Sequence, residues 1–161
     1  DDVLLGRGTY DSWAGYWPTS DVQPFADFIN GSPKHVFTSS PLPAGGWNAA
    51  VPVDGPAVPY VAGLKDRPGG DIGIHGSIEL ARSLLAAGLV DELRLVVCPA
   101  LAGTGRTLFA PGELRRLTLR DARPSPGGTS AFLPIVARIM LIYNSRVGGA
   151  PPDLEDGFYA G

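Results

Sequence analysis

The chain has 161 residues, of which 44% are hydrophobic and 18% are charged, so it can bury the core of one globular domain. Its formal net charge of -3 argues against non-specific binding to nucleic acid or to an anionic membrane, and no apolar run approaches the roughly 20 residues that span a bilayer. The single cysteine, Cys98, lies in an apolar stretch, which indicates a buried structural thiol rather than a reactive one. We therefore expect a cytoplasmic protein with no nucleic-acid or membrane partner.

The first half of the sequence predicts short strands that alternate with short helices. An apolar strand ends at Gly6, and Thr9 is placed to cap a helix over roughly residues 10–14. Residues 41–59 are rich in proline and glycine and are predicted to be mostly loop. The other elements predicted in this half are a helical turn over 24–29, strands over 35–38 and 50–53, and a helix over 58–65.

The second half contains the clearest unit, which is a strand over 71–75, a helix over 78–87 with one apolar face, and a strand over 92–99. Gly88 is a natural end for this helix, and the unit predicts a right-handed crossover between parallel strands. Because strands alternate with helices along the chain, the fold class is α/β. Further strands are predicted over 114–123, 129–133 and 135–143.

Polar residues follow the first strand, in the sequence Gly6-Arg7-Gly8-Thr9. The glycine after the strand allows a sharp turn, and the start of the next helix offers unpaired N–H groups to an anion. Arg7 adds a forked donor that suits phosphate, and Thr9 adds a hydroxyl. The alternative is an ordinary capped helix with a solvated arginine.

A second polar corner follows the strand over 35–38, where Thr38, Ser39 and Ser40 stand in a row before a proline. Such hydroxyls can bind a phosphate, because ligands of open α/β sheets lie at the carboxyl ends of the strands. No acidic residue stands there to bind a free ribose 2′-hydroxyl, which favours NADPH over NADH. The alternative is a Ser/Thr turn.

A third corner joins a strand to the helix over 78–87 through His75, Gly76 and Ser77. The glycine lets a ligand approach the start of the helix, where Ser77 is the expected N-cap and His75 is a candidate cofactor contact. The spacing differs from the GxGxxG fingerprint of Rossmann domains, and the two histidines of the chain are too far apart to suggest a metal site. The alternative is a simple turn with a hydrogen-bonded histidine.

A fourth candidate is the loop that contains Gly103, Gly105 and Arg106, after the strand over 92–99. Its alternative is an ordinary flexible loop. Several anion-binding strand ends in one small sheet carry more weight together than separately. They predict that Arg7 and Thr9, with the other corners, hold the phosphates of a dinucleotide cofactor.

The chain resembles the dihydrofolate reductase-like family in three stretches, which are LLGRGTYDSWAGYWP, PKHVFTSS and GGDIGIHGSIELARSLLAAGLVDELRLVVCPALAGTGRTLF. The closer resemblance is to the bacterial branch related to the reductase domain of riboflavin biosynthesis, the RibD C-terminal domain. It implies a three-layer α/β fold with a central mixed, mostly parallel sheet flanked by helices, and NADPH bound across the strand ends. It also implies cofactor contacts for the three polar corners: Gly6, Arg7 and Thr9; Thr38, Ser39 and Ser40; and His75, Gly76 and Ser77.

The chain differs from the family in the order of its elements. Members of the family open with a strand and a Ser-Leu-Asp-Gly turn, and the stretch IVARIMLIYNSRVGG near the other end of this chain resembles that strand and turn. We therefore expect one domain over residues 1–161 with a circularly permuted order, in which 135–161 correspond to the family's N-terminal strand and loop. The alternative is an additional strand of similar composition.

The permuted order makes Tyr143, Asn144 and Ser145 the candidate catalytic residues. Asn144 and Ser145 stand in for the usual Asp-Gly, and their side chains can form hydrogen bonds but cannot titrate near neutral pH. Tyr143 can stack on an aromatic ligand together with Tyr16 and Trp17, for which core packing is the alternative.

The resemblance implies an NADPH-dependent reductase of a small planar heteroaromatic, carbonyl or imine substrate, and not of dihydrofolate. The cofactor would supply the hydride, while the candidate catalytic residues or a water would assist the proton step. Relatives often dimerise, so a homodimer is an open expectation, and no metal is expected. The alternative function is a non-redox member of the fold that binds a small molecule or catalyses a rearrangement, and the altered Ser-Leu-Asp-Gly region favours it.

Overall fold

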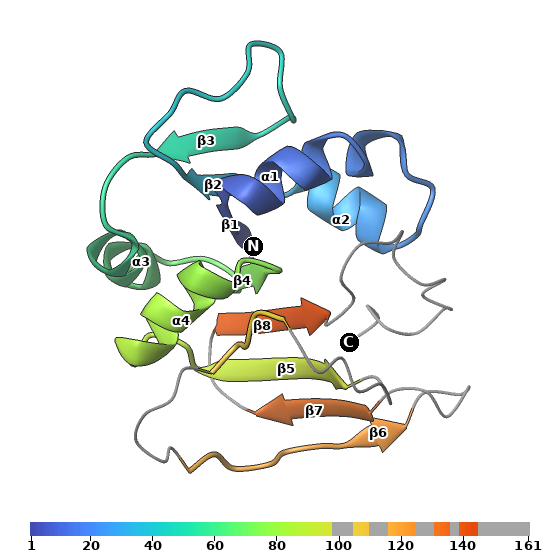
Figure 1. Ribbon diagram of the computed structural model, residues 1–161, viewed down its shortest axis with the longest axis vertical. Helices are drawn as coiled ribbons and strands as arrows, with labels where there is room; N and C mark the ends of the chain where they lie inside the picture. Colours follow the sequence, from blue (N-terminus) through green and yellow to red (C-terminus); the bar gives the residue numbers. More distant parts are fainter. Residues whose placement is uncertain (98–104, 110–115, 125–130, 136–138, 145–161) are drawn as a thin grey trace.

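The computed structural model describes residues 1–97, 105–109, 116–124, 131–135 and 139–144. These residues form one sheet with helices on both of its faces (Figure 1). The helices are α1 (Arg7–Ala14), the 3-10 helix η1 (Trp17–Thr19), α2 (Phe25–Gly31), α3 (Ala57–Lys65) and α4 (Ile78–Ala86). The strands are β1 (Asp2–Gly6), β2 (Lys34–Phe37), β3 (Ala50–Val53), β4 (Ile72–His75), β5 (Glu92–Val97), β6 (Arg123–Pro124), β7 (Ala131–Ile135) and β8 (Ile139–Asn144).

The sheet is mixed and mostly parallel, with the strand order β3-β2-β1-β4-β8-β5-β7-β6. Strands β3 to β5 in this order run parallel to their neighbours, whereas β7 is antiparallel to β5 and β6 is antiparallel to β7. Parallel neighbours end at the same edge of a sheet, so β2, β1, β4, β8 and β5 all end at one edge, which we call the carboxyl edge. This arrangement confirms the predicted α/β fold with a central, mostly parallel sheet.

The two faces of the sheet carry separate hydrophobic cores, because successive side chains of a strand point to opposite faces. In β1, Leu4 packs with α3 and α4, whereas Val3 and Leu5 pack with α1 and α2. Helix α4 contributes Leu80 and Leu84, which lie one turn apart on the same face of the helix. Each such buried side chain contributes about 1.5–3 kcal/mol to stability, so the two cores fix where the strand ends and helix starts meet.

The last strand that the structure describes, β8, lies in the middle of the sheet. Strand β8 pairs in parallel with β4 on one side and with β5 on the other (Figure 1). In this register Leu141 stands opposite both Ile74 and Leu93. It separates the two strands of the predicted strand–helix–strand unit, which remain parallel to each other. The correspondence of β8 to the first strand of the family stays a prediction.

Most predicted elements are present, with boundaries shifted by a few residues. The prediction that Thr9 caps the first helix is wrong. Helix α1 already begins at Arg7, with Gly6 as its N-cap residue, so Thr9 lies inside the first turn and does not cap it. The glycine after α4 is confirmed as a helix end, because Gly88 has φ +69° and sits just beyond the C-cap Ala87.

The strand predicted over 114–123 is wrong for the part that the structure describes. Residues 116–122 lie outside the strands, and only Arg123–Pro124 form β6. Leu117 and Leu119 alternate with polar residues as in a strand, but they are 54% and 59% exposed, so they do not pack into an apolar layer of the described residues. The strand predicted over 135–143 corresponds to β8 over Ile139–Asn144, while Ile135 belongs to β7 and residues 136–138 lie outside the described residues. Cys98 also lies outside them.

Candidate functional site

The carboxyl edge brings the first three predicted corners together. Strand β1 lies between β2 and β4, and Gly6 at its end stands opposite Phe37 at the end of β2. The residues that follow these strands, at the starts of α1 and α4 and in the turn after β2, therefore face one another across a short stretch of the edge. Sequence reasoning predicted this convergence from the parallel order of the strands.

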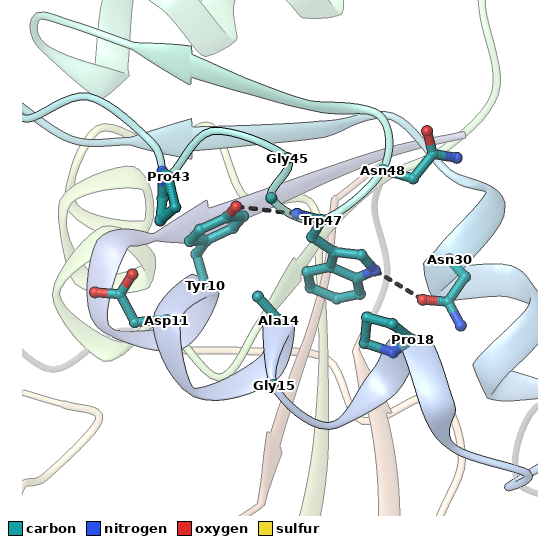
Figure 2. A pocket seen from close by; sticks show the side chains of 11 residues that line it. Tyr10, Asp11, Ala14, Gly15, Pro18, Asn30, Pro43, Gly45, Trp47 and Asn48 are labelled. Carbon is teal, nitrogen blue, oxygen red and sulfur yellow. Dashed lines mark hydrogen bonds between the residues drawn. The ribbon is translucent and has the colours of Figure 1, made fainter.

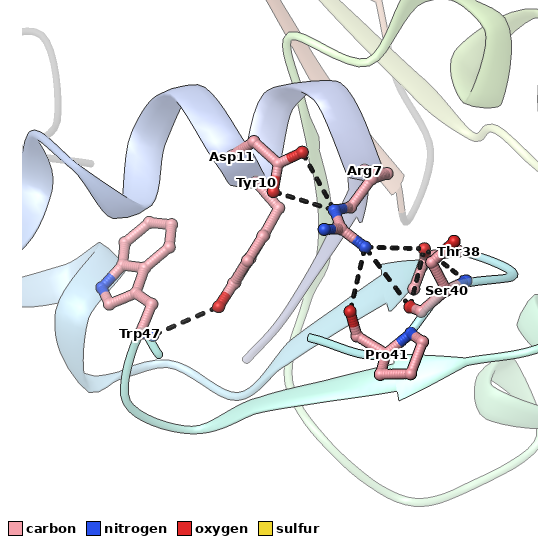
Figure 3. A network of polar contacts seen from close by, with 7 residues as sticks. All are labelled: Arg7, Tyr10, Asp11, Thr38, Ser40, Pro41 and Trp47. Carbon is pink, nitrogen blue, oxygen red and sulfur yellow. Dashed lines mark hydrogen bonds and ion pairs between the residues drawn. The ribbon is translucent and has the colours of Figure 1, made fainter. Parts of the chain in front are cut away.

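Arg7 connects the first corner to the second. Its Nε donates to both carboxylate oxygens of Asp11, at 2.8 and 2.9 Å, one turn along α1. Its Nη1 donates to Thr38 Oγ1 at 3.3 Å, to the carbonyl oxygen of Ser40 at 3.3 Å and to that of Pro41 at 3.2 Å (Figure 3). Among the described residues, none accepts a hydrogen bond from Nη2, so one end of the guanidinium is available to a ligand.

The second corner is a Ser/Thr turn. Thr38 Oγ1 accepts a hydrogen bond from the backbone N–H of Ser40 at 3.1 Å and lies 3.1 Å from its carbonyl oxygen, to which it donates. The hydroxyls of Ser39 and Ser40 are exposed and have no partner within the described part of the chain. The corner thus has the Ser/Thr turn that the alternative assumed, and the exposed Ser39 and Ser40 lie in the turn that Arg7 contacts. Phosphate binding at this corner stays a prediction.

The third corner is tied to the first through Ser77. The backbone N–H of Gly6 donates to Ser77 Oγ at 2.8 Å, and this hydroxyl donates to Thr9 Oγ1 at 2.9 Å. Ser77 is the N-cap residue of α4, as predicted, but its side chain does not bond to the start of its own helix. The first N–H groups of α4 therefore have no side-chain cap, and Gly76, with φ +65°, supplies the left-handed turn that leads to them.

His75 turns its side chain away from the carboxyl edge and into the core under α1 and α2. The imidazole is 1% exposed and lies among the rings of Trp13, Phe25 and Phe28, at centroid distances of 6.0, 5.6 and 6.2 Å. Burial lowers its pKa to about 4, so the ring is neutral at pH 7. Its Nε2 has no hydrogen-bond partner among the described residues, which differs from the hydrogen-bonded histidine that the simple-turn alternative assumed.

The fourth candidate corner is only partly described, because Gly103 lies outside the described residues. Residues 105–109 lie against α4, where Arg82 Nε donates to the carbonyl oxygen of Leu108 at 3.2 Å and Leu108 is buried. Gly105 and Arg106 are exposed, and no described contact joins them to the Arg7 corner.

The candidate catalytic residues lie at the end of β8. Ile142 pairs with His75 in β4, and Asn144 pairs with Val96 in β5, so the backbone of Tyr143 and Asn144 reaches the carboxyl edge beside the third corner. Ser145 lies outside the described residues. Of the two aromatic residues expected to join Tyr143, Trp17 is a core residue at 5% exposure and Tyr16 is 37% exposed.

A hollow of about 630 Å³ lies beside these corners, between α1 and the loop over 43–48 (Figure 2). Tyr10 forms part of its wall, and its hydroxyl accepts a hydrogen bond from the backbone N–H of Trp47 at 3.2 Å. Gly46 is needed there, because a Cβ atom would lie 2.5 Å from that hydroxyl. Asp11 also lines the hollow, so the hollow adjoins the Arg7 corner at this residue.

Sequence reasoning missed a buried lysine next to this hollow. Lys34 Nζ donates to the carbonyl oxygens of Asn30 (3.3 Å), Ser32 (2.8 Å) and Asn48 (3.0 Å), and it lies 4.6 Å from the centroid of the Trp47 ring. Burial lowers its pKa to about 8. The signal that could have found it is strand alternation, because Lys34 stands two residues from the buried Val36 and so shares its face. Its contacts tie the end of α2 to the loop before β3.

Two classes of site are not found in the described part of the chain. No group of three histidine, cysteine or acidic residues there is placed to hold a metal ion. None of the described helices is both long enough and apolar enough to cross a membrane.

Comparison with known proteins places this geometry in a family. Residues 18–131 match the family of the RibD C-terminal domain. The uncharacterized protein YyaP of Bacillus subtilis (strain 168) is 30% identical over 113 residues, which cover 68% of this chain and 59% of the relative. The uncharacterized protein YwjB of the same organism is 32% identical over 109 residues, which cover 68% of this chain and 58% of the relative. The chain thus spans less than two thirds of the length of either relative.

A solved structure has the same fold. It is a protein from Shewanella sp. PV-4 that is named for riboflavin biosynthesis, and it matches with a TM-score of 0.67 over 84% of this chain and 73% of that protein. The two sequences are 19% identical, so the match concerns the fold alone. The predicted dihydrofolate reductase-like architecture is confirmed.

Proposed function

Because the chain belongs to the family of RibD C-terminal domains, we propose that it is an NADPH-dependent reductase that holds the adenosine end of the cofactor at the Arg7 corner. The family is associated with the reductase step of riboflavin biosynthesis, which supports reduction as the class of reaction. The substrate would be a small planar heteroaromatic, carbonyl or imine compound rather than dihydrofolate. When bound, the nicotinamide would supply the hydride, and the protein would hold and orient the two partners.

The observation that carries the proposal is the free end of the Arg7 guanidinium. A ribose 2′-phosphate needs positive charge and hydrogen-bond donors, and Nη2 offers two N–H groups without a partner in the described residues. The exposed hydroxyls of Ser39 and Ser40 lie in the turn that Arg7 already contacts. The start of α1 adds the positive end of a helix dipole at the same place.

The other cofactor residues would serve the pyrophosphate. Helix α4 has nine residues and begins without a side-chain cap, because the hydroxyl of Ser77 is engaged with Gly6 and Thr9 instead. Uncapped N–H groups at the start of a helix bind anions, and Gly76 supplies the left-handed turn that leads to them. The end of β8, with Tyr143 and Asn144, would then lie on the side where the nicotinamide and substrate meet.

The proposal extends to the order of the chain. We propose that residues 135–161 take the place of the first strand and loop of the family, so that 1–161 form one permuted domain. The position of β8 between β4 and β5, parallel to both, supports this correspondence.

Titration of the protein with NADPH and with NADH, with binding measured by calorimetry, tests the proposed function. We expect micromolar binding of NADPH and much weaker binding of NADH. Replacement of Arg7 by alanine should weaken NADPH binding roughly 10- to 100-fold, because a hydrogen-bonded charge is lost, and should leave NADH nearly unchanged.

Arg67→Ala is the matched control, since Arg67 is exposed and follows α3, at the opposite edge of the sheet. Equal affinity of Arg7→Ala and the unmodified protein for NADPH would remove Arg7 from the site. Absence of binding by either nucleotide would instead favour the non-redox alternative.

A further inference from the structure

The Arg7 guanidinium is paired with a carboxylate of its own helix. Both carboxylate oxygens of Asp11 lie within 2.9 Å of Nε, and no described hydrogen bond joins Asp11 to Nη2. Asp11 therefore covers the Nε side of the guanidinium, and Nη1 is engaged with the turn after β2 (Figure 3). Within the described part of the chain, Nη2 is the guanidinium nitrogen left free for an incoming phosphate. A two-pronged contact along the Nε side would require the Asp11 carboxylate to leave.

We propose that Asp11 determines how strongly this corner discriminates a phosphorylated from an unphosphorylated ribose, by opposing the phosphate with its own negative charge. The inference rests on the proposed function, because it concerns the same corner. A phosphate bound at Nη2 lies on the same guanidinium group as the Asp11 carboxylate, so the two anions repel each other. The unphosphorylated nucleotide has no charge at that position and does not feel this repulsion.

The strength of the repulsion between Asp11 and the phosphate depends on how exposed the Arg7–Asp11 pair is to solvent. The side chains of Arg7 and Asp11 are 34% and 50% exposed, and charge interactions at such positions are weakened by water and by salt. Asp11 thus reduces the binding of the phosphate without abolishing it. Its removal should tighten binding of a 2′-phosphorylated nucleotide about threefold, in the range expected for one exposed charge pair.

The direction of the effect follows from what remains when only the charge is removed. In Asp11→Asn, the side-chain oxygen can still accept the hydrogen bond from Nε, so the orientation of Arg7 is retained. The three acceptors of the turn still hold Nη1. If Asp11 served only to orient Arg7, the same substitution would leave binding unchanged or weaken it.

The test uses adenosine 2′,5′-bisphosphate and adenosine 5′-monophosphate, which present the two kinds of ribose without the nicotinamide. Calorimetry on the full chain should show that Asp11→Asn lowers the Kd of the bisphosphate about threefold and leaves that of the monophosphate unchanged. The difference should shrink in 1 M salt, where the screening length is about 3 Å. Asp66→Asn is the control, because Asp66 is an exposed aspartate at the far end of α3.

Unchanged or weaker bisphosphate binding by Asp11→Asn would overturn the inference, as would equal tightening of both nucleotides. Arg7→Ala in the same series separates this failure from that of the proposed function. If Arg7→Ala weakens bisphosphate binding and Asp11→Asn does not strengthen it, only the role of Asp11 is wrong. If Arg7→Ala has no effect, the corner itself does not bind the phosphate.

Discussion

The imidazole of His75 is packed against the sheet over Gly73, where a Cβ atom would lie 2.8 Å from Nε2. A glycine is therefore required two residues before the histidine, on the same face of β4. A buried polar atom without a partner costs about 1–3 kcal/mol, and Nε2 of His75 is such an atom as far as the described residues are concerned. The backbone of His75 helps to form the third corner, while its side chain belongs to the aromatic core under α1 and α2.

This burial predicts a dependence of stability on pH. The pKa of His75 is about 4 in the folded protein and near 6.5 in the unfolded chain. Between these two pH values the imidazole is protonated in the unfolded state and neutral in the folded state. The free energy of unfolding should therefore fall by up to about 3 kcal/mol between pH 6.5 and 4. Urea unfolding at a series of pH values measures it, and His75→Phe should flatten the profile. Parallel profiles for the two proteins would contradict the account.

At the scale of elements, the hydroxyl of Ser77 joins the starts of α1 and α4. It accepts from Gly6, 71 residues away, and donates to Thr9 in the first turn of α1. No local pattern around Gly6 predicts a hydrogen bond from its N–H to Ser77. The sequence analysis therefore placed Thr9 as the cap of the first helix. The same limit applies to residues 116–122, whose alternating pattern predicts a strand although no neighbouring layer covers it.

Loss of this hydroxyl should loosen both corners. Ser77→Ala leaves the N–H of Gly6 without its acceptor in a partly buried position, which should lower the free energy of unfolding by about 1–2 kcal/mol. Ser83→Ala is the matched control in the same helix, because the described contact of its hydroxyl is a local one, to the carbonyl oxygen of Leu80. Urea unfolding should show the control within about 0.5 kcal/mol of the unmodified protein. Equal destabilisation by both changes would mean that Ser77 does not link the corners.

For the whole molecule, the parallel order of the strands explains how much of the site the sequence could predict. Strand ends recognised separately, at Gly6, Thr38 and Gly76, had to meet at one edge once their strands were parallel neighbours. Side-chain partners were not predictable in the same way. The contact of Arg7 Nε with Asp11 follows from helical spacing, because the two residues are one turn apart. The contact of Nη1, and therefore which nitrogen stays free, depends on the turn after β2, which no local pattern predicts. The buried Lys34 likewise depends on the carbonyl oxygen of Asn48, which lies in the loop before β3, as well as on the nearby carbonyl oxygen of Ser32.

The most direct measurement is a crystal structure of the protein with NADP⁺ bound. We predict the 2′-phosphate within hydrogen-bond distance of Arg7 Nη2 and of a hydroxyl of Ser39 or Ser40, and the pyrophosphate at the start of α4. A nucleotide bound in the hollow between α1 and the loop over 43–48, or elsewhere away from the carboxyl edge, would contradict the account.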